Sequence, residues 1–160
     1  MKPIFVTIPH AGEMYPPEVK WLAELPETLL MYDVDRYVDQ LYAPSLSKLG
    51  IPVITTSWHR YVVDPNRIPE DVDSASVEGS PNPVGTHPRG FHWSSTTEGE
   101  KLMPNPISQE LHNLLVQKIY LPFHEKIRQQ FELLHQNGFK SIYHLDCHSC
   151  PSVGTLAHKD

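Results

Sequence analysis

The sequence predicts an α/β domain with a three-layer α/β/α arrangement and a mixed sheet. Short apolar runs rich in β-branched residues occupy 4–8, 53–56 and 141–145, and they alternate with two segments of helical periodicity. Strands that alternate with helices are typical of a sheet covered by helices on its faces. A chain of 160 residues is long enough for one domain with its own core, so we expect a single domain over 1–160.

The first half of the chain supplies the first strand and the first helix. Residues 3–8 are expected to form a buried strand, because the run 4–8 (IFVTI) is continuously apolar except for one threonine. The proline-broken segment 14–30 is expected to be a loop with a short helix. Asp33 is the expected N-cap of a helix that ends just before Gly50, and Pro44 should kink this helix.

The middle of the chain is harder to assign. Residues 53–56 form the next expected strand, and 61–63 either continue it or pair beside it. Residues 65–106 carry many Gly, Pro, Ser and Asn residues without clear periodicity. Because long irregular segments inside a compact domain tend to be functional, we interpret 65–106 as a candidate lid that also holds short strands.

The last third contains the clearest helix. Apolar residues recur every three or four positions through 108–137, and Gly138 marks the end of the pattern. Pro122 lies inside this segment and should bend it. The strand expected at 141–145 then leads directly to His148.

Composition excludes several classes of partner. The formal net charge is −6, and no block of Lys and Arg stands out, so neither nucleic acid nor an anionic membrane surface is an expected partner. No apolar run approaches the roughly 20 residues of a membrane span, and the N-terminus lacks a signal pattern, which predicts a cytoplasmic protein. Cys147 and Cys150 are too few for a disulfide framework; a redox pair remains an alternative, although Cys147 should face away from Asp146 on a strand.

Polar residues follow each expected strand at its carboxyl end, where ligands of α/β sheets gather. His10 follows the first strand, Asn66 and Arg67 follow 61–63, and His148 follows the last. The planar guanidinium of Arg matches a carboxylate, which favours an acidic small molecule as the ligand. The alternative is that the segment Asp64-Pro65-Asn66 is a plain turn, which its residue types favour when it is taken alone.

The spacing of His10 and Glu13 is H-x-x-E, which lets an imidazole and a carboxylate reach the same ion. A distant His148 would complete a catalytic zinc site of two histidines and one carboxylate, with one position open. Asp35 is a further candidate to point into this pocket, whereas Asp33 is interpreted as a helix cap.

Five ordered motifs resemble those of the N-formylglutamate amidohydrolase family. They are His10-Ala11-Gly12, Asp33-x-Asp35, Arg60-Tyr61-Val62-Val63-Asp64-x-Asn66-Arg67, Tyr120-x-Pro122-Phe123-His124 and Asp146-x-His148-Ser149. The resemblance spans nearly the whole chain. It implies a zinc-peptidase-like (phosphorylase/hydrolase-like) fold, and cleavage of the N-formyl or a similar N-acyl amide of an acidic amino acid such as N-formyl-L-glutamate, a reaction of histidine degradation.

The resemblance also implies a role for each matching residue. A single Zn²⁺ would activate water, and the oxyanion would be stabilised by a guanidinium. Carboxylates would orient the imidazoles from behind, and an amide with a guanidinium would bind the substrate carboxylate. The implied zinc ligands are His10, Glu13 and His148, the orienting residues Asp64 and Asp146, the catalytic residue Arg60, and the substrate-binding residues Asn66 and Arg67.

The chain departs from the family pattern after His148. Family members continue with a segment that carries the general-base glutamate, whereas this chain ends at Asp160. We therefore expect the domain to be incomplete at its C-terminus. The alternative function is a non-catalytic zinc- or ligand-binding relic that lacks this glutamate; the oligomeric state does not follow from the sequence.

Overall fold

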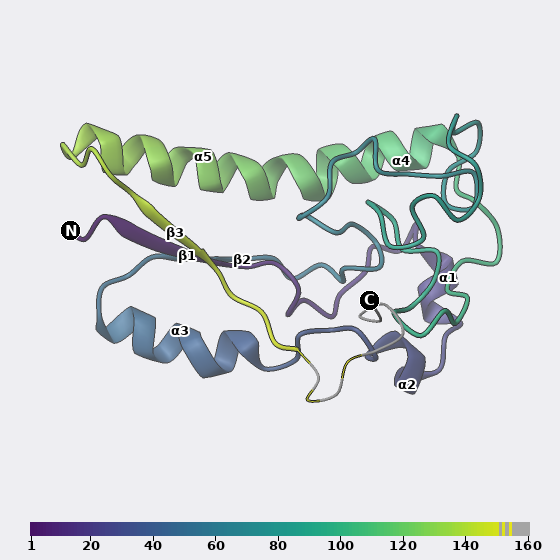
Figure 1. Cartoon of the computed structure of the whole chain (residues 1–160), viewed down its shortest axis with the longest axis horizontal. Helices are drawn as coiled ribbons and strands as arrows, with labels where there is room; N and C mark the ends of the chain where they lie inside the picture. Colours follow the sequence, from purple (N-terminus) through teal and green to yellow (C-terminus); the bar gives the residue numbers. More distant parts are fainter. Residues whose placement is uncertain (151, 153, 155–160) are drawn as a thin grey trace.

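The computed structural model describes residues 1–150, 152 and 154 and has an α/β architecture built on a small parallel sheet (Figure 1). The strand order is β2–β1–β3, where β1 spans Ile4–Ile8, β2 spans Val53–Thr55 and β3 spans Tyr143–Asp146. Both pairings are parallel, so the predicted mixed sheet is wrong for the described part of the chain. The reason is that helices lie between consecutive strands and return the chain to the same end of the sheet.

Helices connect the strands and cover the sheet. In chain order they are α1 (Lys20–Ala23), α2 (Glu27–Leu30), α3 (Val38–Lys48), α4 (Gln109–Leu115), the π-helical turn η1 (Val116–Tyr120) and α5 (Leu121–Gln136). None of the helices in the described residues is long and apolar enough to cross a membrane.

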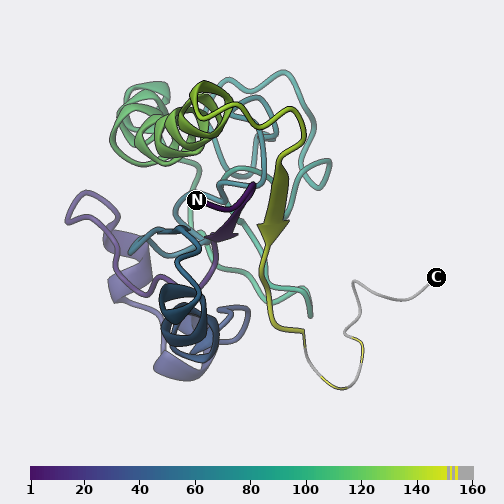
Figure 2. The same ribbon diagram turned by 90° about the vertical axis from the view of Figure 1, so that its left-hand side faces the viewer.

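The central strand β1 contacts helices on both of its faces. Phe5 packs in one cluster with Phe123 and Leu134 of α5. Val6 points to the opposite face and packs with Val38 of α3, because successive side chains of a strand alternate. Figure 2 shows α5 and α3 on either side of β1, with β3 displaced to one side of both helices.

The long helix predicted over 108–137 is confirmed, with a change of pitch in its middle. Ser108 caps α4, where its side chain accepts a hydrogen bond from the Leu111 N–H at 3.2 Å. The wider turn η1 lies just before Pro122, which has no N–H to donate to the preceding turn. Gly138 ends the helical run at φ 86°, as predicted.

The predicted N-cap role of Asp33 is wrong. Helix α3 begins only at Val38, after Tyr37 in a left-handed conformation at φ 67°. The Asp33 carboxylate instead accepts hydrogen bonds from the Tyr61 hydroxyl at 2.7 Å and from Thr97 Oγ1 at 2.6 Å. Asp33 therefore ties distant loops together rather than starting a helix.

The predicted strand at 61–63 is also wrong, because this segment is a buried turn. The N–H of Val62 donates to the carbonyl of His59 at 3.0 Å, which reverses the chain instead of extending it. The side chains are nevertheless at most 1% exposed, because they pack in the largest hydrophobic cluster together with Phe91 and Trp93. An apolar run thus marks the core here without forming a strand.

Residues 65–106 are not a lid over the surface. Phe91, Trp93, Leu102 and Met103 are buried in the same cluster, so the segment forms part of the core. The expected short strands amount to isolated bridges. Asp73 is fully buried, and its carboxylate accepts from the N–H groups of three residues, each at 2.9 Å: Ala75, Gly85 and His87.

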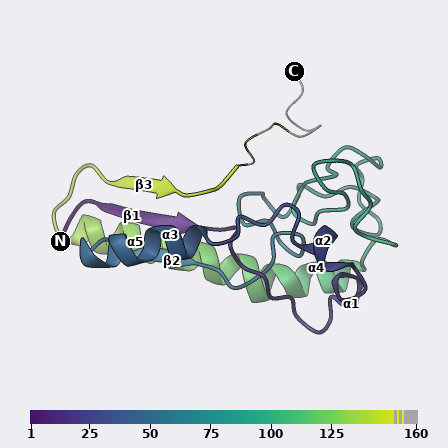
Figure 3. The same cartoon turned by 90° about the horizontal axis from the view of Figure 1, so that it is seen from below.

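Strand β3 is one of the two edge strands of the sheet and is exposed along its length. Tyr143 is 63% exposed and Leu145 is 48% exposed. Figure 3 shows α3 and α5 gathered around β1 and β2, with β3 lying beyond them. The part of the site carried by β3 is therefore more open than the part carried by β1.

Candidate metal centre at the strand ends

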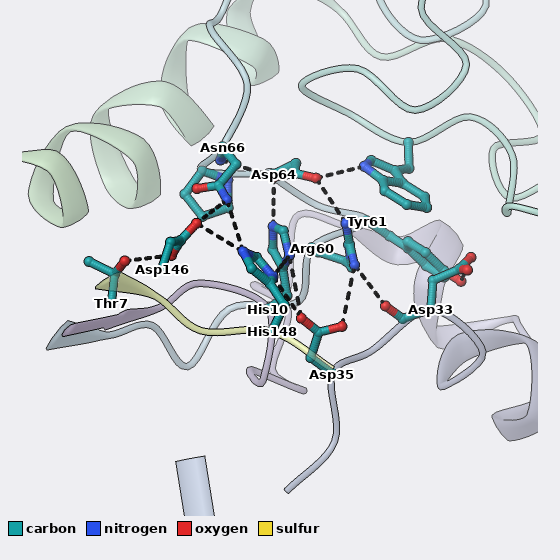
Figure 4. A network of polar contacts seen from close by, with 12 residues as sticks. Thr7, His10, Asp33, Asp35, Arg60, Tyr61, Asp64, Asn66, Asp146 and His148 are labelled. Atoms are coloured by element: carbon teal, nitrogen blue, oxygen red, sulfur yellow. Dashed lines mark hydrogen bonds and ion pairs between the residues drawn. The ribbon is translucent and has the colours of Figure 1, made fainter. Parts of the chain in front are cut away.

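Two histidines and a carboxylate converge where β1 and β3 end (Figure 4). His10 follows β1, His148 follows β3, and Asp35 lies in the loop that precedes α3. His148 Nδ1 lies 3.2 Å from His10 Nδ1 and 2.9 Å from Asp35 Oδ2. The ligand atoms of the three residues all lie within 4.8 Å of one another, which is a possible metal-binding triad.

Each imidazole is oriented by a second carboxylate behind it. His10 Nε2 lies 2.7 Å from Asp64 Oδ1, and His148 Nε2 lies 2.9 Å from Asp146 Oδ2. Because a carboxylate only accepts, both Nε2 atoms carry the proton, and the two Nδ1 atoms turn toward each other. Carboxylates behind metal-binding imidazoles commonly fix the tautomer in this way.

This orientation requires a positive charge between the rings. Two neutral imidazoles would present lone pairs to each other at 3.2 Å. In the metal-free protein a proton satisfies them, since hydrogen bonds to Asp146 and Asp35 raise the pKa of His148 to about 9. The same donor set fits a metal cation, because two imidazole nitrogens and a carboxylate oxygen are ordinary ligands of Zn²⁺ and similar ions.

Asp35 and Asp64 remain ionised although both are buried. Burial alone would raise the pKa of Asp64, but hydrogen bonding to His10 and the charges of His10 and Arg60 outweigh it and hold the pKa at about 2. Burial likewise opposes ionisation of Asp35, and hydrogen bonds to His10 and His148 with the charge of Arg60 bring its pKa to about 2. The site therefore keeps fixed negative charge for a cation.

Four donors satisfy the carboxylate of Asp64. Oδ1 accepts from His10 and from the N–H of Asn66 at 3.0 Å, while Oδ2 accepts from Trp93 Nε1 at 3.1 Å and from Arg60 at 3.4 Å. The side chain of Arg60 also donates to the carbonyl of Asp33 at 3.0 Å. Arg60 is thereby held beside the triad, 3.7 Å from Asp35 Oδ1.

The expected ligand Glu13 does not join the triad, and Asp35 supplies the carboxylate instead. Glu13 is exposed, and its carboxylate accepts from Arg36 Nε at 3.0 Å. The backbone between His10 and Glu13 is closely packed, since a Cβ added at Gly12 would lie 2.5 Å from the backbone carbon of Ser57.

Asn66 and Arg67 are adjacent in sequence, but their side chains lie in different surroundings. Asn66 Nδ2 donates to Asp146 Oδ2 at 2.6 Å, so its amide supports the carboxylate behind His148. Arg67 lines a polar hollow of about 340 Å³ together with Arg89 and His87. The structure thus does not place the two side chains on one common ligand surface.

The remaining predicted residues take structural places. Asp146 accepts from Thr7 Oγ1 at 2.5 Å, which ties the end of β3 to β1. Cys147 packs in the cluster that contains Val6, away from the triad, and neither Cys147 nor Cys150 forms a disulfide among the described residues.

Two features of this region were not predicted from the sequence. Trp93 contacts both Asp64 and Arg60 from a position 29 residues beyond Asp64. His92 is fully buried, and its Nε2 lies 3.0 Å from His112 Nδ1. No spacing signal links these residues, because they meet only through the fold of segment 65–106.

Fold and site together define an α/β protein with a triad of two histidines and one carboxylate at the strand ends. A family model described as N-formylglutamate amidohydrolase matches residues 2–159. The chain therefore belongs to the N-formylglutamate amidohydrolase family, as its motifs predicted.

Individual relatives agree with this assignment. An N-formylglutamate deformylase from Pseudomonas putida is 28% identical over 154 residues, which cover 94% of this chain and 52% of the relative. A crystal structure of N-formylglutamate amidohydrolase from Ralstonia eutropha JMP134 aligns with a TM-score of 0.76 and 27% identity, over 93% of this chain and 53% of that one. A gene product from Agrobacterium tumefaciens shares the fold, with a TM-score of 0.71 at 18% identity over 96% of this chain and 54% of that one. The chain spans about half the length of these relatives.

Proposed function

We propose that this chain carries the zinc site of an amidohydrolase that cleaves the N-formyl or a similar N-acyl amide of an acidic amino acid such as N-formyl-L-glutamate. The convergence of His10, Asp35 and His148 is the observation that carries this proposal. The reaction class is inferred from the family, whose named relatives act on N-formylglutamate. Zinc suits two imidazoles and one carboxylate with an open coordination position.

The residues of this chain would divide the work as follows. Zinc, when bound, would polarise the scissile carbonyl and lower the pKa of a bound water. Asp64 and Asp146 would keep the Nδ1 lone pairs of His10 and His148 directed at the metal. Arg60 lies beside Asp35, where its guanidinium would donate to the oxyanion that forms from the carbonyl.

Arg67 would bind the carboxylate of the substrate. It lines the 340 Å³ hollow together with Arg89 and Asp71, and the two guanidinium groups outweigh the one carboxylate, which favours an acidic ligand. The neighbouring Asn66 would act indirectly, since its amide already donates to Asp146. A small-molecule N-acyl amino acid is the partner that fits these groups.

The wider architecture belongs to the same proposal. We infer a single domain in which α3 and α5 form the outer layers and the sheet forms the middle layer, related to the zinc peptidases. The residues that build the triad follow β1, precede α3 and follow β3. A place in histidine degradation follows from the proposed substrate.

A non-catalytic metal- or ligand-binding role is the second candidate, and the carboxylates of the site favour it. A general base works best with a pKa near the working pH. Burial would raise the pKa values of Asp35, Asp64 and Asp146, yet hydrogen bonds to histidines lower all three. Each carboxylate that the structure places at the triad is hydrogen-bonded to a histidine, so none of them has the raised pKa that a general base needs.

Metal analysis and a formate assay distinguish the two candidates. Protein purified without chelator should contain one zinc, Asp35→Asn and His148→Ala should lose it, and Glu13→Gln should retain it as the matched control. Equal zinc in Asp35→Asn and wild type would remove Asp35 from the ligand set. Formate release from N-formyl-L-glutamate supports the enzyme, whereas stoichiometric zinc without formate release supports the binding role.

A further inference from the structure

Trp93 contacts two of the charged groups beside the triad at the same time. Its Nε1–H donates to Asp64 Oδ2 at 3.1 Å. The guanidinium carbon of Arg60 lies over its ring, 4.3 Å from the ring centroid. A cation held over an indole face is stabilised by the ring electrons. The one side chain therefore sets the position of both an anion and a cation.

The indole is itself fixed by the core. Trp93 is 3% exposed, its backbone N–H donates to the Tyr61 carbonyl at 3.3 Å, and the centroid of its ring lies 5.5 Å from that of Tyr61. Arg60 depends on this support, because its Nε is buried without a hydrogen-bond partner in the described part of the chain. The ring face compensates in part for the interactions that this nitrogen lacks.

We propose that Trp93 is a positioning residue for the metal site, acting through Asp64 and Arg60. With Oδ2 held by the indole N–H, the Asp64 carboxylate directs Oδ1 at His10 Nε2. Without that donor, Oδ2 would be left with Arg60 at 3.4 Å, and the carboxylate would turn toward the guanidinium and away from His10. This inference rests on the proposed metal site but concerns a residue outside the triad.

The first test is a double-mutant cycle on zinc affinity, measured by competition with a chromophoric chelator. Trp93→Phe keeps a ring face for Arg60 but removes the N–H, so we expect zinc binding to weaken by about 10- to 100-fold, as for other residues that orient metal ligands. In the Asp64→Ala background the same change should cost less than about twofold, because the carboxylate that Trp93 holds is gone. An equal loss in both backgrounds would indicate a merely structural tryptophan and overturn the proposal.

The chain supplies a matched control in Trp21. Its Nε1 is also buried, but it has no hydrogen-bond partner among the described residues. Trp21→Phe should therefore leave zinc affinity unchanged. If Trp93→Phe does not fold, replacement of Trp93 by the isosteric benzothienylalanine removes the N–H while keeping the shape, and the same loss of affinity is expected.

A second readout does not require metal. The Nε2–H of His10 should give a protected downfield proton signal in the metal-free protein, assigned by its loss in His10→Asn. We expect its exchange with water to accelerate about tenfold or more in Trp93→Phe and to stay unchanged in Trp21→Phe. An unchanged signal in Trp93→Phe contradicts the positioning role, whereas a wild-type protein that shows the signal but binds no zinc contradicts only the proposed function.

Discussion

Stability should fall as the pH drops below neutrality, because of a buried neutral histidine. His92 is fully buried, its Nδ1–H donates to the Val62 carbonyl, and its Nε2 accepts from His112. Burial lowers the pKa of His92 from 6.5 to about 3. Between these two pKa values His92 is protonated in the unfolded chain but stays neutral in the folded chain, so the free energy of unfolding decreases as the pH falls.

The magnitude follows from the difference between the two pKa values. A pH of 4.5 lies two units below 6.5, the pKa of the His92 imidazole in the unfolded chain, so this imidazole is protonated there. In the folded chain the imidazole is still neutral at this pH. One unit corresponds to about 1.4 kcal/mol, so His92 alone should remove about 2 to 3 kcal/mol of stability between pH 7.5 and pH 4.5.

Urea unfolding of metal-free protein, followed by tryptophan fluorescence, tests this value. His92→Asn keeps a donor for the Val62 carbonyl but does not titrate. Between about pH 7.5 and pH 4.5 the variant should therefore lose about 2 to 3 kcal/mol less of its free energy of unfolding than the wild type does. The exposed His135 provides the control, since His135→Asn should leave the pH dependence as in wild type. Parallel curves for wild type and His92→Asn would refute the reasoning.

Three further predictions concern the binding hollow and the backbone. Arg67→Ala should weaken binding of N-acylglutamate at least about 30-fold by calorimetry, and Arg67→Lys should recover only part of it; equal affinities would place the carboxylate elsewhere. Asp73→Ala should lower the free energy of unfolding by about 2 to 4 kcal/mol, because it removes the buried carboxylate that accepts from three backbone N–H groups, whereas Asp39→Ala, on α3, should have little effect. Gly12→Ala should cost about 1 to 3 kcal/mol, since its methyl would lie 2.5 Å from the backbone of Ser57; an unchanged urea midpoint would contradict this contact.

Local patterns predicted the elements whose causes are local. The apolar run 4–8 became β1, and the helical periodicity of 108–137 became α4, η1 and α5. His10 and His148 follow strands in sequence, so their meeting at one sheet edge could be anticipated from parallel pairing.

The failures arise where distant groups compete for a residue. Asp33 has the sequence position of a helix cap, but its carboxylate accepts hydrogen bonds from Tyr61 and Thr97, which lie 28 and 64 residues away. Glu13 has a metal-binding spacing, but its carboxylate accepts from Arg36, 23 residues away, instead of joining the triad. Spacing in the sequence cannot report either contact, and for the same reason Asp35 was a candidate for the pocket without being an expected ligand.

The exposed position of β3 makes its order depend on what bridges it to the rest of the sheet. Strand β3 carries Asp146 and leads to His148, while His10 follows the buried strand β1. A cation shared by the two histidines would act as a cross-link between the first and last strands, closing a loop of nearly the entire chain. Its binding energy would then appear as folding energy. Fraying of β3, and with it the tendency of an open strand edge to pair with other chains, would rise as the metal concentration falls.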